Sequence, residues 1–204
     1  MNKQIIRIAI LISGRGSNMV ALSKAVIRGE VPGAEIVLVV SDKPKAAGLN
    51  AASELQLETL VVERRGRSRE EHEAEIISAL RERKVDLVCL AGYMRVLSSC
   101  FIEAFPRRVL NIHPSLLPSF HGLDAHRQAL AHGVKFSGCT VHFIDDTLDD
   151  GPIIAQRVVP VLDDDTEETL SARILEQEHS VYAEALRLVV SGDYEVVGRR
   201  VVKK

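Results

Sequence analysis

Few cysteines, no long hydrophobic run and little net charge characterise this 204-residue sequence. The three cysteines, Cys89, Cys100 and Cys139, are odd in number and form no CxxC pair, which argues against a disulfide framework and a cysteine metal site. We therefore expect reduced thiols in a cytoplasmic protein. No apolar run approaches membrane-spanning length, and the run at 5–12 leads into a glycine-rich turn, so it predicts a buried strand instead of a signal peptide.

The near balance of charge limits the classes of partner. With 26 basic and 28 acidic residues the net charge is −2, so no global basic field points to nucleic acid, and small or polar substrates remain. Apolar residues make up 46% of the chain, enough for the core of one compact domain. Because no repeat, low-complexity tract or linker interrupts the sequence, we expect a single domain over 1–204.

Apolar runs alternate with amphipathic segments along the chain. The patterns predict strands at 5–12, 35–40, 59–62, 86–91, 109–112, 138–144, 153–161 and 194–202. They predict helices at 19–28, 45–55, 68–84 and 123–131, and a long helix starting near 165. This order favours an α/β fold with a doubly wound, mostly parallel sheet flanked by helices, in which ligands bind at the carboxyl ends of the strands.

A polar pair closes the strand at 109–112. Residues two apart in a strand point the same way, so Asn111 and His113 are expected on one side, and Pro114 prevents the strand from continuing as a central ladder. An amide donor beside an imidazole can polarise a carbonyl and move a proton. The alternative is a polar strand end whose histidine only binds backbone.

A glycine-rich turn follows the first strand. Gly14 and Gly16 allow a tight turn, and Ser17 and Asn18 precede a helix, an arrangement that aims backbone N–H groups at an anion such as phosphate. The alternative is an ordinary turn in which the serine and asparagine only cap the helix. A dinucleotide is disfavoured because Met19 stands where GxGxxG has its third glycine.

Two further loops follow predicted strands. The segment 92–97 combines apolar residues with one cation and is expected at the same edge as the glycine turn, unless it is only a packing loop. Asp42 favours a strand-end turn, with contact to a ribose hydroxyl as the alternative. The basic segment 64–67 is expected in solvent.

Histidines and acidic residues concentrate in the second half of the chain. Five of the seven histidines lie between 113 and 142, but without HExxH or paired spacing they disfavour a metal site. The acidic loop 145–152 favours a solvated turn, whereas a carboxylate held beside His113 would keep its ring charged and oriented. In the helix that starts near 165, Glu178 is expected opposite the apolar face, in solvent unless a ligand reaches it.

Three separated motifs, at 12–18, 111–118 and 141–152, together resemble the phosphoribosylglycinamide formyltransferases, members of the folate-dependent formyltransferase family. The second and third motifs are shared by the wider family of formyltetrahydrofolate-using enzymes. The first motif narrows the resemblance to the phosphoribosylglycinamide formyltransferases. It implies a Rossmann-like formyltransferase fold with a phosphate- or nucleotide-binding half, 1–105, and a catalytic and folate-binding half, 106–204. It also implies formyl transfer from 10-formyltetrahydrofolate to the amine of glycinamide ribonucleotide in purine biosynthesis, by a monomer or homodimer that needs no metal.

The resemblance also assigns residues. It makes Asn111, His113 and Asp149 catalytic, and places the substrate phosphate on Gly16, Ser17 and Asn18 and its amine end near Glu178. It assigns the folate to Arg69, Met94, Arg95, Val96, Leu97, Asn111, Asp145, Asp146, Thr147, Leu148 and Asp149. The sequence departs from the family pattern at Arg15, where Asn is frequent, at His121 and Asp124, where Pro and His occur in some relatives, and at Asp150, where Gly is frequent.

Three other functions would require different features of the chain. A formyltetrahydrofolate hydrolase is expected to carry an extra N-terminal regulatory domain, whereas the strand system here starts at Ile5. A methionyl-tRNA formyltransferase is expected to have an added C-terminal domain with a basic surface. A non-catalytic phosphate- or nucleotide-binding module would have no use for the trio Asn111, His113 and Asp149.

Overall fold

The computed structural model describes residues 5–204, which form two compact units, one ending at Leu110 and one starting at Asn111. The first unit contains β1 (Ile6–Ile12), α1 (Ser17–Ile27), β2 (Ala34–Ser41), α2 (Ala47–Glu54), β3 (Thr59–Val61), α3 (Arg69–Glu82), β4 (Leu87–Leu90) and α4 (Ser99–Ala104). The strand β5 (Val109–His113) runs across the boundary.

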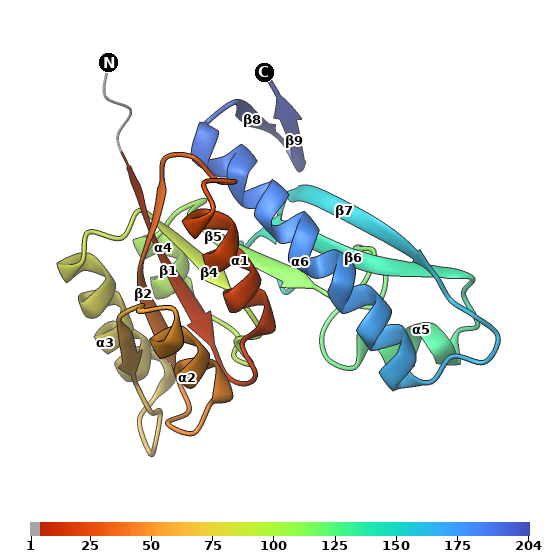
Figure 1. Cartoon of the computed structure of the whole chain (residues 1–204), viewed down its shortest axis with the longest axis horizontal. Helices are drawn as coiled ribbons and strands as arrows, with labels where there is room; N and C mark the ends of the chain where they lie inside the picture. Colours follow the sequence, from red (N-terminus) through yellow and green to blue (C-terminus); the bar gives the residue numbers. More distant parts are fainter. Residues whose placement is uncertain (1–4) are drawn as a thin grey trace. The chain divides into compact units, whose positions relative to one another are not determined.

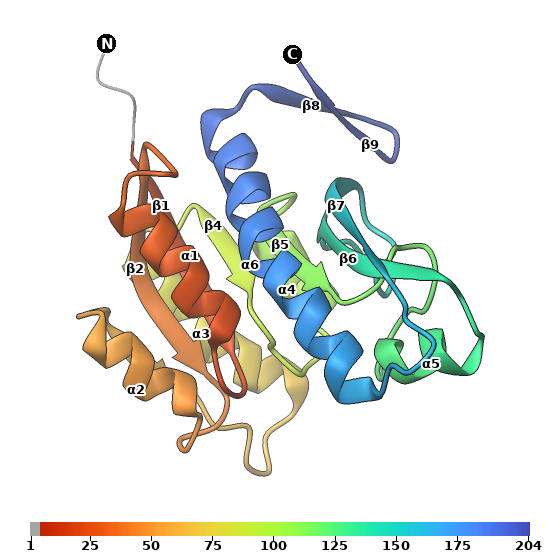
Figure 2. The same cartoon turned by 45° about the vertical axis from the view of Figure 1, so that its right-hand side comes forward.

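A parallel sheet forms the centre of the first unit. Its strands lie in the order β3-β2-β1-β4, and every neighbouring pair is parallel. Helices α1 and α2 pack together on one face, and α3 and α4 on the other (Figures 1 and 2). Residues 8–12 of β1 are fully buried because helices cover both faces of this central strand. The unit therefore has the doubly wound α/β arrangement that the sequence predicts.

The second unit contains α5 (Ala125–Ala131), β6 (Phe136–Phe143), β7 (Ile153–Pro160), α6 (Glu167–Ser191), β8 (Tyr194–Val197) and β9 (Arg200–Lys203). Strands β6 and β7 are antiparallel, β9 pairs parallel to β7, and β8 pairs antiparallel to β9. The long helix α6 packs on β6 and β7 (Figure 1). It begins at a capping box in which Thr166 and Thr169 bind each other's backbone N–H groups.

Two elements differ from the sequence prediction. The prediction of a single strand at 194–202 is wrong. Gly198, with φ +62°, reverses the chain, so β8 and β9 form an antiparallel hairpin. The short helix α4 was not predicted, since its six residues are too few to show a helical period. Ser98 caps this helix by accepting from the N–H of Phe101 at 3.4 Å.

The capping box of α3 allows a test of the fold. Ser68 accepts from the N–H of Glu71 at 3.1 Å, while the Glu71 carboxylate accepts from the N–H of Ser68 at 2.9 Å. We predict that Ser68→Ala lowers the free energy of unfolding by about 1 kcal/mol, measured by urea denaturation. Ser78→Ala, at an exposed position of the same helix, is the matched control and should change it by less than about 0.5 kcal/mol. Equal losses in the two variants would contradict the capping role.

Candidate active site

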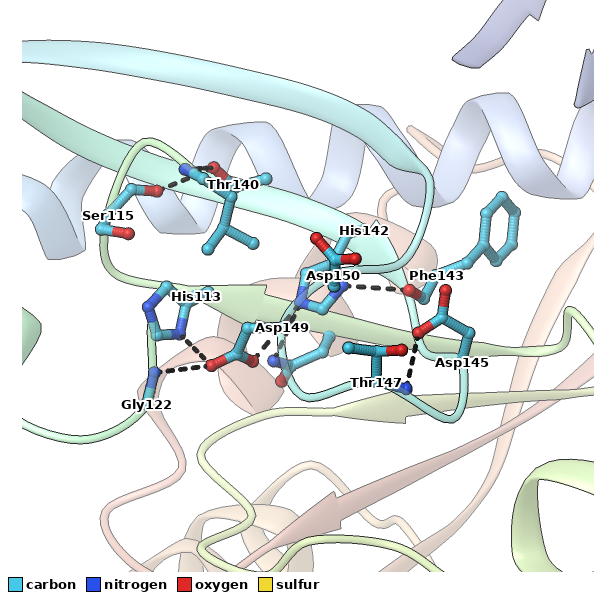
Figure 3. A network of polar contacts seen from close by, with 12 residues as sticks. His113, Ser115, Gly122, Thr140, His142, Phe143, Asp145, Thr147, Asp149 and Asp150 are labelled. Carbon is cyan, nitrogen blue, oxygen red and sulfur yellow. Dashed lines mark hydrogen bonds and ion pairs between the residues drawn. The ribbon is translucent and has the colours of Figure 1, made fainter. Parts of the chain in front are cut away.

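His113, at the end of β5, lies between two hydrogen-bond acceptors. Its Nε2 is 2.8 Å from the carbonyl oxygen of Phe120. Its Nδ1 is 3.4 Å from Oδ2 of Asp149 (Figure 3). A neutral imidazole has only one N–H, so it would leave one ring nitrogen facing an acceptor without a proton. The imidazolium form presents an N–H to each acceptor, and the residue is only 4% exposed, so this arrangement suits the charged form of the ring.

Asp149 is held toward His113 by the backbone around it. It adopts the left-handed conformation, with φ +52°, and its Oδ2 also accepts from the N–H of Gly122 at 2.9 Å (Figure 3). Two residues later, a Cβ on Gly151 would lie 1.8 Å from the carbonyl oxygen of Phe143, so only glycine fits there. The loop is thereby constrained to present one carboxylate to the histidine.

His142 orients the amide of Asn111. It is fully buried on β6, burial lowers its pKa, and its Nδ1 lies 3.0 Å from the carbonyl oxygen of Phe143, so Nδ1 carries the proton of a neutral ring (Figure 3). Nε2 is then an acceptor, and it lies 3.3 Å from Nδ2 of Asn111. One N–H of that amide is thus directed to His142, which leaves the other for a ligand.

Thr140 fixes the loop that follows His113. Its hydroxyl donates to the carbonyl oxygen of Ser115 at 2.7 Å and accepts from the N–H of Leu117 at 3.0 Å (Figure 3). Gln156 adds bonds to the same hydroxyl at 2.9 Å and to the Leu117 carbonyl at 3.0 Å. Side chains of β6 and β7 therefore hold the backbone of Ser115 and Leu117, in the loop that follows His113.

Residues 145–148 and 150 of the acidic loop are more exposed to solvent than Asp149. Asp146, Thr147 and Leu148 are exposed, and Asp145 accepts from the N–H of Thr147 at 3.0 Å, as in a local turn (Figure 3). Asp150 pairs with Arg199, whose guanidinium lowers the pKa of this carboxyl group. The departure at position 150 thus adds a charge that the protein neutralises.

Glu178 contradicts the position expected from the sequence. Its side chain is buried, with the residue 7% exposed, instead of lying in solvent. The spacing 170, 174, 178, 181, 185 repeats every three or four residues, so Glu178 lies on the apolar face of α6. This face packs on β6, where burial raises the pKa of the Cys139 thiol to about 12 and the charge of Glu178 adds to the rise.

The glycine turn in the first unit opens α1. Gly16 is the residue before the helix and has φ +75°, so Ser17 and Asn18 belong to the first turn and are not the cap. By helix geometry the N–H groups of this turn have no intrahelical acceptor, which suits an anion. A Cβ on Gly16 would lie 2.8 Å from the Cα of Gly48, and the N–H of Gly48 donates to the Gly14 carbonyl at 3.0 Å. Sequence analysis missed Gly48, because only the folded chain brings α2 to the turn.

Four of the residues assigned to the folate line one pocket of the first unit. Its volume is about 210 Å³, and its lining is Arg64, Arg69, His72, Glu73, Met94, Arg95 and Val96. Met94 and Val96 are exposed apolar side chains, and Leu97 is buried outside the lining. Glu73 is directed to Ser98, whose backbone N–H and hydroxyl both donate to it. The basic segment 64–67, expected in solvent, thus contributes Arg64 to a pocket.

The sequence profile of the formyl transferase family matches residues 6–186. The chain belongs to the formyl transferase family. It is 47% identical over 91% of its length to the trifunctional purine biosynthetic protein adenosine-3 of Drosophila melanogaster, but spans only 14% of that protein. It is 42% identical to the phosphoribosylglycinamide formyltransferase of Escherichia coli (strain K12), with 86% of this chain and 82% of the relative covered.

Solved formyl transferase structures share this fold. The crystal structure of glycinamide ribonucleotide transformylase 1 from Symbiobacterium toebii matches with a TM-score of 0.96 and 46% identity, covering 100% of this chain and 95% of that one. The predicted α/β fold is therefore confirmed along the chain. Among residues 5–204, no cluster of His, Cys, Asp or Glu could hold a metal ion. In the same range no helix is long and apolar enough to cross a membrane.

The contact between α2 and the glycine turn yields a prediction. A Cβ on Gly48 would lie 2.7 Å from Cδ1 of Ile12 and 3.1 Å from the Cα of Gly16, both closer than ordinary contact. We expect Gly48→Ala to reduce the free energy of unfolding by about 1–3 kcal/mol, as overpacking does. Asn50→Ala, at an exposed position of α2, is the control and should be near neutral in the same denaturation experiment. If the Gly48→Ala variant had the same free energy of unfolding as the wild type, the glycine turn would have shifted to accept the methyl group and the prediction would be wrong.

Proposed function

We propose that this chain transfers the formyl group of 10-formyltetrahydrofolate to the amine of glycinamide ribonucleotide, a step of de novo purine biosynthesis. The observation that carries the proposal is the buried His113, held between Asp149 and the Phe120 carbonyl beside the oriented amide of Asn111. The names of the relatives from Escherichia coli and Symbiobacterium toebii support the choice of acceptor.

The reaction makes simple demands on the protein. A bond forms between the amine nitrogen and the formyl carbon, the bond from that carbon to the folate nitrogen breaks, and one proton moves from the amine to the folate nitrogen. Negative charge develops on the formyl oxygen in between. The protein must stabilise that charge, move the proton and bind two anionic substrates.

In this proposal, Asn111 supplies the direct donor to the formyl oxygen. One N–H of its amide is directed to His142 at 3.3 Å, and the other is left for the oxygen. Both nitrogens of His113 already face acceptors, so His113 acts chiefly through its positive charge. A preorganised donor or charge of this kind contributes about 3 kcal/mol to transition-state stabilisation.

Asp149 has two roles in the proposal. Its carboxylate keeps His113 protonated, and through a water molecule it carries the proton from the attacking amine to the departing folate nitrogen. The left-handed backbone at this residue and the N–H of Gly122 hold the carboxylate in position for both. Asn111, His113 and Asp149 are therefore the proposed catalytic residues.

Substrate binding is proposed to use the remaining assigned residues. The first turn of α1, with Gly16, Ser17 and Asn18, is suited to the phosphate of the ribonucleotide. Glu178, on α6, is proposed for the amine end. For the folate we propose Arg69 and Met94–Leu97 of the first unit and Asp145–Asp149 of the second, where apolar side chains suit its rings and guanidinium groups suit its carboxylates.

A steady-state assay tests the assigned function. We expect tetrahydrofolate to form from 10-formyltetrahydrofolate only when glycinamide ribonucleotide is present. Formate release at the same rate without the ribonucleotide would instead identify a hydrolase. No turnover under either condition, with phosphate esters still bound, would identify a non-catalytic binding module.

Variants test the assigned residues. We predict that His113→Ala or Asp149→Ala lowers kcat by a factor of about 10² to 10⁴, because the charge and the proton path are lost. Asp163→Ala is the matched control, since it removes a carboxylate that pairs with Lys135 on the surface of the same unit, and should leave kcat unchanged. Circular dichroism would establish that all three variants fold. Wild-type turnover in either site variant would rule out its catalytic role.

A further inference from the structure

Asp42, directly after β2, is buried although it follows a strand end. Its side chain is 2% exposed, and its Oδ2 accepts from Nε of Arg95 at 2.6 Å, while the arginine side chain is 30% exposed. The neighbouring Ser41 makes the local turn, through bonds to the backbone of Lys43 at 2.9 and 3.1 Å. Asp42 is therefore available for the contact with Arg95.

The second carboxylate oxygen of Asp42, Oδ1, is not stabilised by a hydrogen bond from any described residue. Oδ1 is buried and has no hydrogen-bond partner among residues 5–204, and the same holds for the hydroxyl of Tyr93. Burial raises the pKa of Tyr93, and the charge of Asp42 adds to the rise. A buried carboxylate with one bonded oxygen is a poor source of stability, so its value to the protein lies in what it does to Arg95.

Arg95 is held at one edge and left open at the other. Only its Nε is bonded to Asp42, and within the described range no hydrogen bond engages its terminal amino groups. Its backbone is fixed as well, since the N–H of Met94 donates to Oγ of Ser13 at 2.9 Å and the N–H of Ser13 donates to the Gly92 carbonyl at 3.1 Å. Arg95 lines the 210 Å³ pocket, so both its main chain and its side chain are preorganised there.

The remainder of that pocket suits an anion attached to a ring. Arg64 and Arg69 form no ion pair with any described residue, and Met94 and Val96 offer exposed apolar surface beside them. The carboxylate in the lining, Glu73, is occupied by Ser98. The pocket therefore presents guanidinium groups to a ligand carboxylate.

We propose that Asp42 is a positioning residue that turns the open edge of Arg95 toward the carboxylates of the glutamate tail of the folate. The proposal rests on the proposed function and deepens it. A guanidinium binds a carboxylate through two parallel hydrogen bonds, which requires a fixed plane, and a free arginine side chain loses much rotational freedom to adopt one. Asp42 fixes that plane before the ligand arrives.

If Asp42 acted only through its charge, its removal would strengthen the binding of a carboxylate by Arg95, whereas the loss of a positioning residue would weaken it. Removing the negative charge of Asp42 would leave Arg95 more positive and would strengthen its attraction for a carboxylate. Because the arginine is partly exposed, solvent and salt screen this gain. Orientation is therefore expected to outweigh neutralisation, and the sign of the effect distinguishes the two.

Binding measurements by calorimetry test the proposal with two ligands. Tetrahydrofolate carries the glutamate carboxylates, and tetrahydropteroate has the same rings without the glutamate. We expect Asp42→Ala to weaken tetrahydrofolate binding roughly tenfold and to leave tetrahydropteroate binding unchanged. Asp42→Asn, which keeps an acceptor for Nε, should lose less. Glu35→Ala, which removes the surface pair with Arg7 at the other end of β2, is the matched control and should bind both ligands as the wild type does.

A double variant isolates the route of the effect. In an Arg95→Ala background, Asp42→Ala should cause no further loss, because the group it positions is gone. Equal weakening of the two ligands, tighter binding of tetrahydrofolate to Asp42→Ala, or a loss that persists without Arg95 would each overturn the proposal. Wild-type protein that binds no tetrahydrofolate would contradict the proposed function itself. Wild-type binding with an unaffected Asp42→Ala variant would remove only the role of Asp42.

Discussion

The placement of two acceptors around one imidazole is the constraint on which the candidate active site in the second unit depends. The Phe120 carbonyl and the Asp149 carboxylate face the two ring nitrogens of the buried His113, an arrangement that suits the charged form of the ring. A buried cation is costly unless its partners are held in place, so the surrounding backbone has to be rigid. The left-handed conformation of Asp149 and the Thr140 contacts supply that rigidity.

The two histidines of this site have different hydrogen-bond surroundings. His142 has the Phe143 carbonyl at one nitrogen and the Asn111 amide at the other, with the Asp149 carboxylate 3.9 Å from that second nitrogen. Burial still lowers its pKa, which suits a neutral ring. His113 has an acceptor at each nitrogen, which suits an imidazolium. The same type of side chain thus orients an amide donor in one place and faces two acceptors in the other.

The sequence predicted the elements better than the contacts between them. Periodicity located β1 and α6 because a buried strand and an amphipathic helix leave local patterns in the chain. The same pattern indicates the position of Glu178, which is the fourth residue after Ile174 and so falls on the apolar face. The prediction that it lies in solvent relied on its charge instead of its spacing. The roles of His142 and Gly48 could not be predicted, since each depends on residues from another element. The hairpin of β8 and β9 depended on one glycine conformation that a single sequence does not reveal.

The equipment around His113 does not by itself select the group that receives the formyl. A charge, a donor and a carboxylate would serve an attacking water as well as an attacking amine, because both reactions pass through the same kind of oxyanion. Selection must come from groups that bind the rest of the acceptor, and a phosphate is the part of a ribonucleotide that water lacks. In the proposed function, that phosphate binds at the turn at Gly16, so the turn would favour the transferase over the hydrolase. The geometry of the turn depends in turn on the absence of a side chain at Gly48.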